Sequence, residues 1–83
     1  MRPAVECFAR EMERQLARQD VEHGGDGWRG LGVRQAELLC SLQRKVAELT
    51  YDTCEGRDPT VNAAHVANFA MMIADNWWGG ERR

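Results

Sequence analysis

One stretch of the chain, from Asp58 to Gly80, constrains the fold more than any other. It opens with Asp58 and Pro59, a residue suited to capping a helix N-terminus followed by proline at the helical position that tolerates it best. It closes at Gly79-Gly80, where we expect the helix to stop or relax. The residues between, about 19 of them, make a rod of roughly 28 Å. Because this helix is apolar on nearly every side, other elements have to cover it nearly all round.

Two further helices are predicted from apolar residues at helical spacing. The first, over about 3–18, carries the stripe Val5, Phe8, Met12 and Leu16. The second, over about 33–53, carries the stripe Leu38, Leu39, Leu42, Val46 and Leu49. Residues 19–32 lie between them and hold five glycines in fourteen residues, so we expect a loop there.

These elements predict an all-α chain, with one domain over 1–83 and a third helix over about 59–77. A core of this size is marginal alone, and two short helices cannot cover the third. We therefore expect the subunits to assemble through the apolar third helix into a dimer or a tetramer.

Polar residues on the third helix form a ridge within this apolar background. Asn62, His65, Asn68 and Met72 follow one another at i+3 and i+4 spacing and therefore share one side. These side chains are either solvated or hydrogen-bonded to a neighbouring helix, or they form the polar wall of a ligand pocket.

In the loop, Trp28 follows His23 and several glycines, and it is either a packing anchor or a flat face for stacking a base.

Composition excludes several classes of function. Eleven Lys and Arg against thirteen Asp and Glu leave no global basic field, so duplex nucleic acid is not an expected partner. No stretch has the length and apolarity of a membrane span, and we expect a cytoplasmic protein without a membrane partner. Cys7, Cys40 and Cys54 are far apart and lack metal-ligand spacing, which favours reduced structural thiols.

The order of these features resembles the small MazG-like proteins, which are all-α nucleoside triphosphate pyrophosphohydrolases familiar in short form from bacteriophages. The resemblance covers about 8–76, and its most specific parts are the run Ala63 to Asp75 and the loop His23 to Trp28, with an additional Asp26. It implies a helical subunit that dimerises or tetramerises. It also implies a carboxylate cage that holds Mg²⁺ for cleavage between the α and β phosphates.

The chain departs from that family where the metal ligands are expected. The Glu-Glu-x-x-Glu positions read Arg44-Lys45-Val46-Ala47-Glu48, and the Glu-x-x-Asp positions read Asn62-Ala63-Ala64-His65. Of the five acidic ligands only Glu48 remains. A divalent ion about 5 Å from one positive charge is repelled by roughly 7 kcal/mol at an effective dielectric near 20. We therefore predict that metal binding and hydrolysis are lost, with no catalytic residue, no metal ligand and no cofactor.

Binding is the function expected to remain, because Arg44 and Lys45 can supply the positive charge that Mg²⁺ supplies in the family. The predicted ligand-binding residues are His23, Trp28, Arg44, Lys45, Glu48, Asn62, His65, Asn68 and Met72. The predicted ligand is a nucleotide or another phosphate-bearing compound derived from one. In a phage-encoded protein, the use would be sequestration of a signalling nucleotide in the host cytoplasm.

Two alternatives stay open. The first is an active pyrophosphohydrolase that uses Mg²⁺ in a site rebuilt from Glu48, Asp52, His65 and Asp75. The second is an oligomeric interaction protein without a nucleotide, which docks a partner through its third helix and the Trp77-Trp78 tail.

Overall fold

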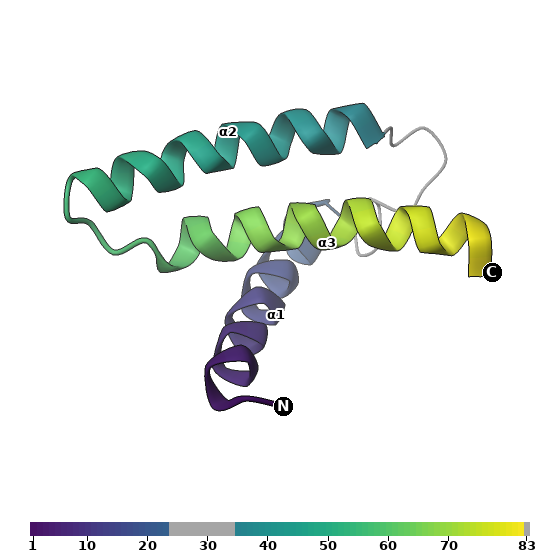
Figure 1. Ribbon diagram of the computed structural model, residues 1–83, viewed down its shortest axis with the longest axis horizontal. Coiled ribbons are helices and arrows are strands. Elements are labelled where there is room, and N and C mark those ends of the chain that lie inside the picture. The colour runs from purple at the N-terminus through teal and green to yellow at the C-terminus, as the bar shows by residue number, and fades with distance from the viewer. Residues whose placement is uncertain (24–34, 83) are drawn as a thin grey trace.

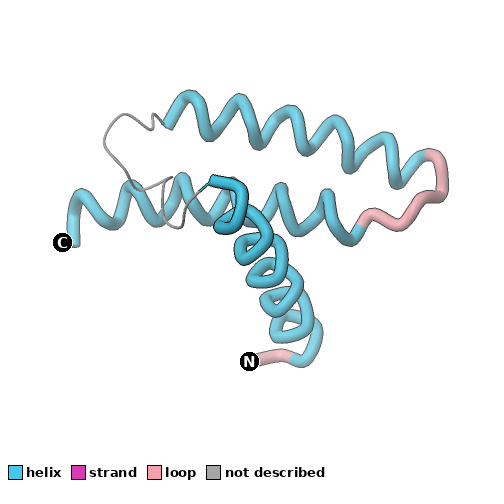
Figure 2. The backbone as a smooth tube through the Cα atoms, turned by 180° about the vertical axis from the view of Figure 1, so that it is seen from behind, coloured by secondary structure: helices cyan, strands magenta, loops and turns pink. Residues whose placement is uncertain are grey.

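The computed structural model describes residues 1–23 and 35–82, with the side chains of 23 and 79–82 left out. These residues form three helices, α1 (Pro3–His23), α2 (Gln35–Cys54) and α3 (Thr60–Arg82). The described part of the chain contains no strand, which confirms the predicted all-α class. Figure 1 shows α2 and α3 lying side by side and antiparallel, while α1 crosses α3 steeply. Figure 2 shows the same crossing from behind.

The turn between α2 and α3 is fixed by backbone hydrogen bonds and one glycine. The amide of Arg57 donates to the Asp52 carbonyl at 2.8 Å, and the amide of Gly56 donates to the Thr53 carbonyl at 3.4 Å. This pair of bonds is the Schellman arrangement, which places the residue after the helix cap in the left-handed region. Gly56 occupies that position with φ +70°, so the sequence Glu55-Gly56 ends α2 and reverses the chain.

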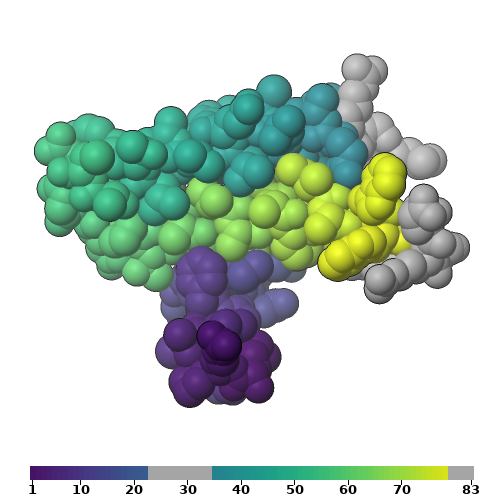
Figure 3. Space-filling model, in the orientation of Figure 1, coloured from purple at the N-terminus to yellow at the C-terminus, as the bar shows by residue number. Residues whose placement is uncertain are grey.

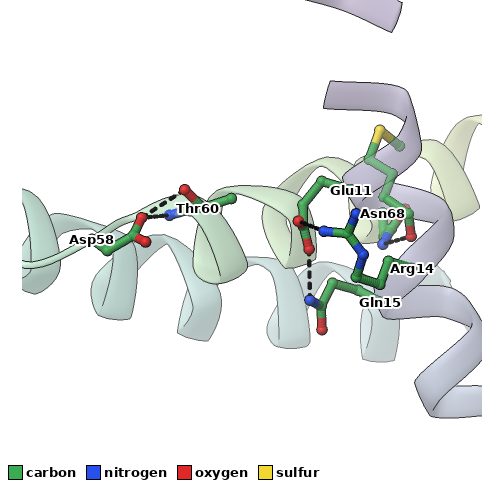
Figure 4. Close-up of polar contacts among 7 residues, drawn as sticks. Glu11, Arg14, Gln15, Asp58, Thr60 and Asn68 are labelled. Carbon is green, nitrogen blue, oxygen red and sulfur yellow. Dashed lines mark hydrogen bonds and ion pairs between the residues drawn. The ribbon is translucent and has the colours of Figure 1, made fainter. Parts of the chain in front are cut away.

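The start of α3 follows the prediction from Asp58 and Pro59. Asp58 Oδ1 accepts hydrogen bonds from the Thr60 amide at 2.9 Å and from the Thr60 hydroxyl at 2.6 Å (Figure 4). The carbonyl of Pro59 accepts the amide of Ala63 at 2.8 Å, which begins the helical ladder. Asp58 is therefore the N-cap that the sequence indicated.

Two predicted boundaries were wrong. The first helix does not end near residue 18 but continues to His23, because 19–22 contain neither glycine nor proline and the glycines begin only at Gly24. The third helix does not end near residue 77 but continues through Gly79-Gly80 to Arg82. A glycine weakens a helix by about 1 kcal/mol relative to alanine, yet it keeps both backbone hydrogen-bonding groups and does not break the ladder. The start of α2 at Gln35 leaves residues 33 and 34 outside the described part, and its end at Cys54 is one residue beyond the prediction.

The core within one subunit is small. Among the described residues, the buried apolar side chains are those of Leu38, Ala64 and Met72. Both α1 and α2 pack on α3, so α3 is the central element that the sequence predicted. Figure 3 shows α1 projecting away from the α2–α3 pair. The three helices form a compact domain, and several of the predicted core residues remain on its surface.

Candidate anion-binding site

The facing sides of α2 and α3 are joined by polar contacts at both ends of the pair. Near the turn, Asn62 Nδ2 donates to Asp52 Oδ2 at 2.6 Å. Toward the other end, Gln35 Nε2 donates to the carbonyl of Ile73 at 2.9 Å. Since α2 and α3 are antiparallel, these two bonds set the register of the pair and align the middle of α2 with the first half of α3.

Lys45 and Glu48 form an ion pair on the middle of α2. The Lys45 Nζ atom lies 2.9 Å from Glu48 Oε2, and the Lys45 side chain is only 25% exposed. The hydrogen bond from Lys45 is the main reason that the pKa of Glu48 lies below its ordinary value, and the charges of Lys45, Arg44 and His65 act in the same direction. The carboxylate of Glu48 is therefore ionised at neutral pH and is already matched by a cation.

His65 lies partly buried beside this pair. Burial lowers the pKa of His65, the positive charges of Lys45 and Arg18 lower it further, and the charge of Glu48 opposes them. The imidazole is therefore neutral at neutral pH and offers one N–H donor. Arg18 belongs to α1 and Lys45 to α2, so cations from two helices act on one residue of the third.

We define the cation cluster as Arg18, Arg44, Lys45, Glu48 and His65. The set holds three basic side chains and one carboxylate. Lys45 and Arg44 act on Glu48, Lys45 and Arg18 act on His65, and Arg44 is exposed on the same side of α2 as Glu48, one turn away. Guanidinium and ammonium groups form charge-assisted hydrogen bonds with phosphate oxygens. The arrangement can therefore hold an anion without a metal ion.

The structure divides the polar ridge of α3. Asn62 and His65 approach α2, but Asn68 is turned toward α1, where its Nδ2 donates to the carbonyl of Met12 at 3.1 Å (Figure 4). Asn68 is only 3% exposed and Met72 only 8%, so both are packed inside the subunit. For these two residues the structure favours the packing interpretation over that of a pocket wall.

The remaining predicted site residues lie at the edge of what is described. His23 ends α1, but its side chain is outside the described residues, and so is all of Trp28. Their predicted contacts with a ligand stay predictions. Of the predicted set, the structure brings together Lys45, Glu48 and His65, with Arg44 and Asn62 one turn to either side.

Two residues of this region were missing from the predicted binding set. Asp52 was named only in the alternative metal site, although it follows Lys45 and Glu48 at helical spacing and therefore shares their side of α2. Arg18 had no such signal. It is far from His65 in the sequence and lies on another helix, so only the packing of α1 on α3 reveals it.

A metal centre has no support in the described residues. They contain no group of three or more His, Cys, Asp and Glu side chains that could hold a metal ion. Cys7, Cys40 and Cys54 are free thiols and are exposed.

No described helix is long and apolar enough to cross a membrane.

Comparison with known proteins gives no relative. The chain matches no family model, no curated protein and no solved structure. The resemblance to MazG-like proteins therefore stays a prediction from the residues that carry it.

Proposed function

We propose that this chain binds a nucleotide, or another phosphate-bearing ligand derived from one, and holds it without hydrolysis. The observation that carries the proposal is the position of Lys45. Its ammonium group lies 2.9 Å from Glu48 and acts on the partly buried His65 across the α2–α3 contact. In the family that the chain resembles, this place belongs to a carboxylate cage and its metal ions.

The charge of the cluster supports an anionic ligand. Glu48 is matched by Lys45, and the guanidinium of Arg44 forms no ion pair or hydrogen bond with a described residue, although its charge acts on Glu48. A phosphate that accepts a charge-assisted hydrogen bond from Arg44 gains about 1.5–3 kcal/mol. The neutral imidazole of His65 adds a donor without adding charge. Asn62 is already bonded to Asp52 and supports the site by fixing α2 against α3.

The absence of hydrolysis is proposed from the same residues. Cleavage between the α and β phosphates in the MazG-like enzymes requires metal ions to orient the triphosphate and activate water. Here the ammonium of Lys45 already occupies one side of the Glu48 carboxylate. A cation at that point opposes a second, divalent cation. The proposed use is therefore sequestration, and a signalling nucleotide is one candidate for the ligand.

Assembly of several subunits is part of the proposal. The sequence predicted a contact through the third helix, and that contact stays a prediction; exposed apolar residues lie on α2 as well as on α3, and we propose a contact on α2. Leu39 is 46% exposed and Val46 is 43% exposed, and they lie seven residues apart on one flank of α2. Arg44 and Glu48 lie on the other flank. A contact between copies through Leu39 and Val46 would cover apolar surface and leave the cation cluster open.

Calorimetry tests the binding. The protein is titrated in EDTA with a panel of nucleoside monophosphates, triphosphates and cyclic nucleotides. We expect at least one to bind, and we expect Arg44→Glu to weaken that binding at least tenfold, since about 1.4 kcal/mol corresponds to a factor of ten. The matched control is Arg10→Glu, which makes the same charge change on α1 at an exposed residue paired with Glu6. Absence of binding across the panel, or equal losses in both variants, would contradict the proposal.

A further inference from the structure

The end of α1 reaches the cation cluster through one ridge of side chains. Glu11, Gln15 and Arg18 follow one another at i+4 and i+3 spacing and therefore share one side of the helix. Gln15 is only 4% exposed, and its Nε2 donates to Glu11 Oε2 at 2.8 Å. Figure 4 shows the hydrogen bond between Glu11 and Gln15 and the one that Asn68 of α3 donates to α1. Arg18 is the next residue of this ridge and is exposed where the buried contact ends.

The contact of α1 with α3 places Arg18 near His65. Asn68 is hydrogen-bonded to the carbonyl of Met12 at 3.1 Å, which fixes the crossing point of the two helices. His65 precedes Asn68 by almost one turn of α3, and Arg18 follows Met12 by less than two turns of α1. The positive charges of Arg18 and Lys45 both lower the pKa of His65.

Arg18 has no partner of its own within the described residues. The other arginines of this part of α1 differ, because Arg10 pairs with Glu6 and Arg14 pairs with Glu11. A guanidinium whose charge acts on a partly buried imidazole, and which has no carboxylate partner among the described residues, is available to an incoming anion.

From this placement we propose that Arg18 is a ligand-binding residue, and that a phosphate group bound between Arg18 and Lys45 clamps α1 onto the α2–α3 pair. The inference rests on the proposed function and names a new residue and a new consequence of binding. Within the described residues, the side chain of Asn68 joins α3 to α1 through its hydrogen bond to the carbonyl of Met12. A ligand that bridges α1 and α2 adds a further connection and therefore slows local opening of α1.

Binding of pyrophosphate and ATP in EDTA tests the role of Arg18. The variant is Arg18→Gln, and the control is Arg10→Gln, which removes the same charge from an exposed position nearer the start of the same helix. Both variants keep a good helix former at a surface position, so both are expected to fold, as circular dichroism will check. We expect Arg18→Gln to weaken binding about tenfold or more and Arg10→Gln to leave it within about twofold.

Hydrogen exchange tests the clamp. Saturating ATP is expected to slow amide exchange in the second half of α1 in the wild-type protein. In Arg18→Gln, at a concentration that gives equal occupancy, this protection is expected to be lost. If the wild-type protein binds neither pyrophosphate nor ATP nor any nucleotide of the panel, the proposed function itself fails. If Arg44→Glu weakens binding while Arg18→Gln equals its control, or if α1 shows no ligand-dependent protection, the proposed function stands and the clamp is refuted.

Discussion

At the scale of single residues, a capping carboxylate fixes where α3 begins, and an ion pair sets the charge on the side of α2 that faces α3. Lys45 is the clearest case, because its ammonium group satisfies the Glu48 carboxylate while acting on His65. Asp58 is a second, since it receives two hydrogen bonds from Thr60 at the start of α3. Both interactions depend on an ionised carboxylate, so both can be followed by changing the pH.

The cap of α3 gives a prediction on acid stability. The hydrogen bonds from Thr60 hold the pKa of Asp58 below its ordinary value. A carboxyl group whose pKa is lowered by folding stabilises the protein above the unfolded-state pKa of about 3.9, and this contribution is lost as the pH falls through the folded-state pKa. We expect Asp58→Asn, which caps without a charge, to match the wild-type melting temperature at pH 7 within a few degrees. Below about pH 4, the melting temperature of the variant should fall less steeply with pH than that of the wild-type protein.

The control for the cap is Asp58→Ala. It removes the hydrogen-bond acceptor and should lower the melting temperature at pH 7 and at pH 5. An equal acid dependence in the wild-type protein and in Asp58→Asn would show that the carboxylate of Asp58 does not contribute in this way.

At the scale of elements, the contact of α1 with α3 contains a polar group that stability alone does not explain. Asn68 Oδ1 is buried and has no hydrogen-bond partner among the described residues, although its Nδ2 bonds to the carbonyl of Met12. The bond contributes about 1 kcal/mol, and a buried acceptor without a partner costs about 1–3 kcal/mol. Asn68 therefore fixes the crossing point of α1 and α3 without adding to the free energy of unfolding, or while lowering it.

Replacement of Asn68 by leucine, which has a similar volume, is predicted to leave the free energy of unfolding unchanged or to raise it by about 1–2 kcal/mol in urea titrations. The control is Asn62→Leu in the same helix, which breaks the 2.6 Å bond to Asp52 and is expected to lower it by roughly 1 kcal/mol. A fall in stability of more than about 1 kcal/mol for Asn68→Leu would mean that the Met12 bond outweighs the unpaired oxygen.

The elements also show how far the sequence could be used for prediction. Periodicity located the three helices, and Asp58-Pro59 located the start of α3 to within one residue. The division of the α3 ridge was not predictable, because Asn62 and Asn68 lie six residues apart and only the crossing angle of α1 decides which neighbour each one meets. Arg18 entered the cluster for the same reason. Local spacing identifies residues on one helix side, but it does not identify what another helix brings to that side.

At the scale of the whole molecule, one subunit leaves much of its apolar surface uncovered. Val46 and Leu39 are exposed on α2, and Trp77 is 65% exposed near the end of α3. A second copy covering Val46 is the assembly that we propose, so Val46→Glu should place a charge in the contact.

The assembly is measured by light scattering coupled to size exclusion. We expect the wild-type mass to be a multiple of the 9.4 kDa chain and Val46→Glu to shift it toward one subunit. Ala47→Glu adds the same charge at the next, exposed residue of α2 and should leave the mass unchanged. A wild-type protein that elutes as a single subunit at micromolar concentration would contradict the proposed assembly.

The central claim is that the cation cluster holds a phosphate-bearing nucleotide and leaves it intact. A ³¹P NMR spectrum tests both parts in one sample, with the protein, magnesium and one equivalent of the nucleoside triphosphate that bound most tightly in the calorimetric panel. We predict that the phosphate resonances shift or broaden on addition of protein, do so less with Arg44→Glu, and keep their integrated areas over hours. The appearance of a pyrophosphate resonance at a rate that depends on protein concentration would contradict the account, as would a spectrum identical to that of the free nucleotide.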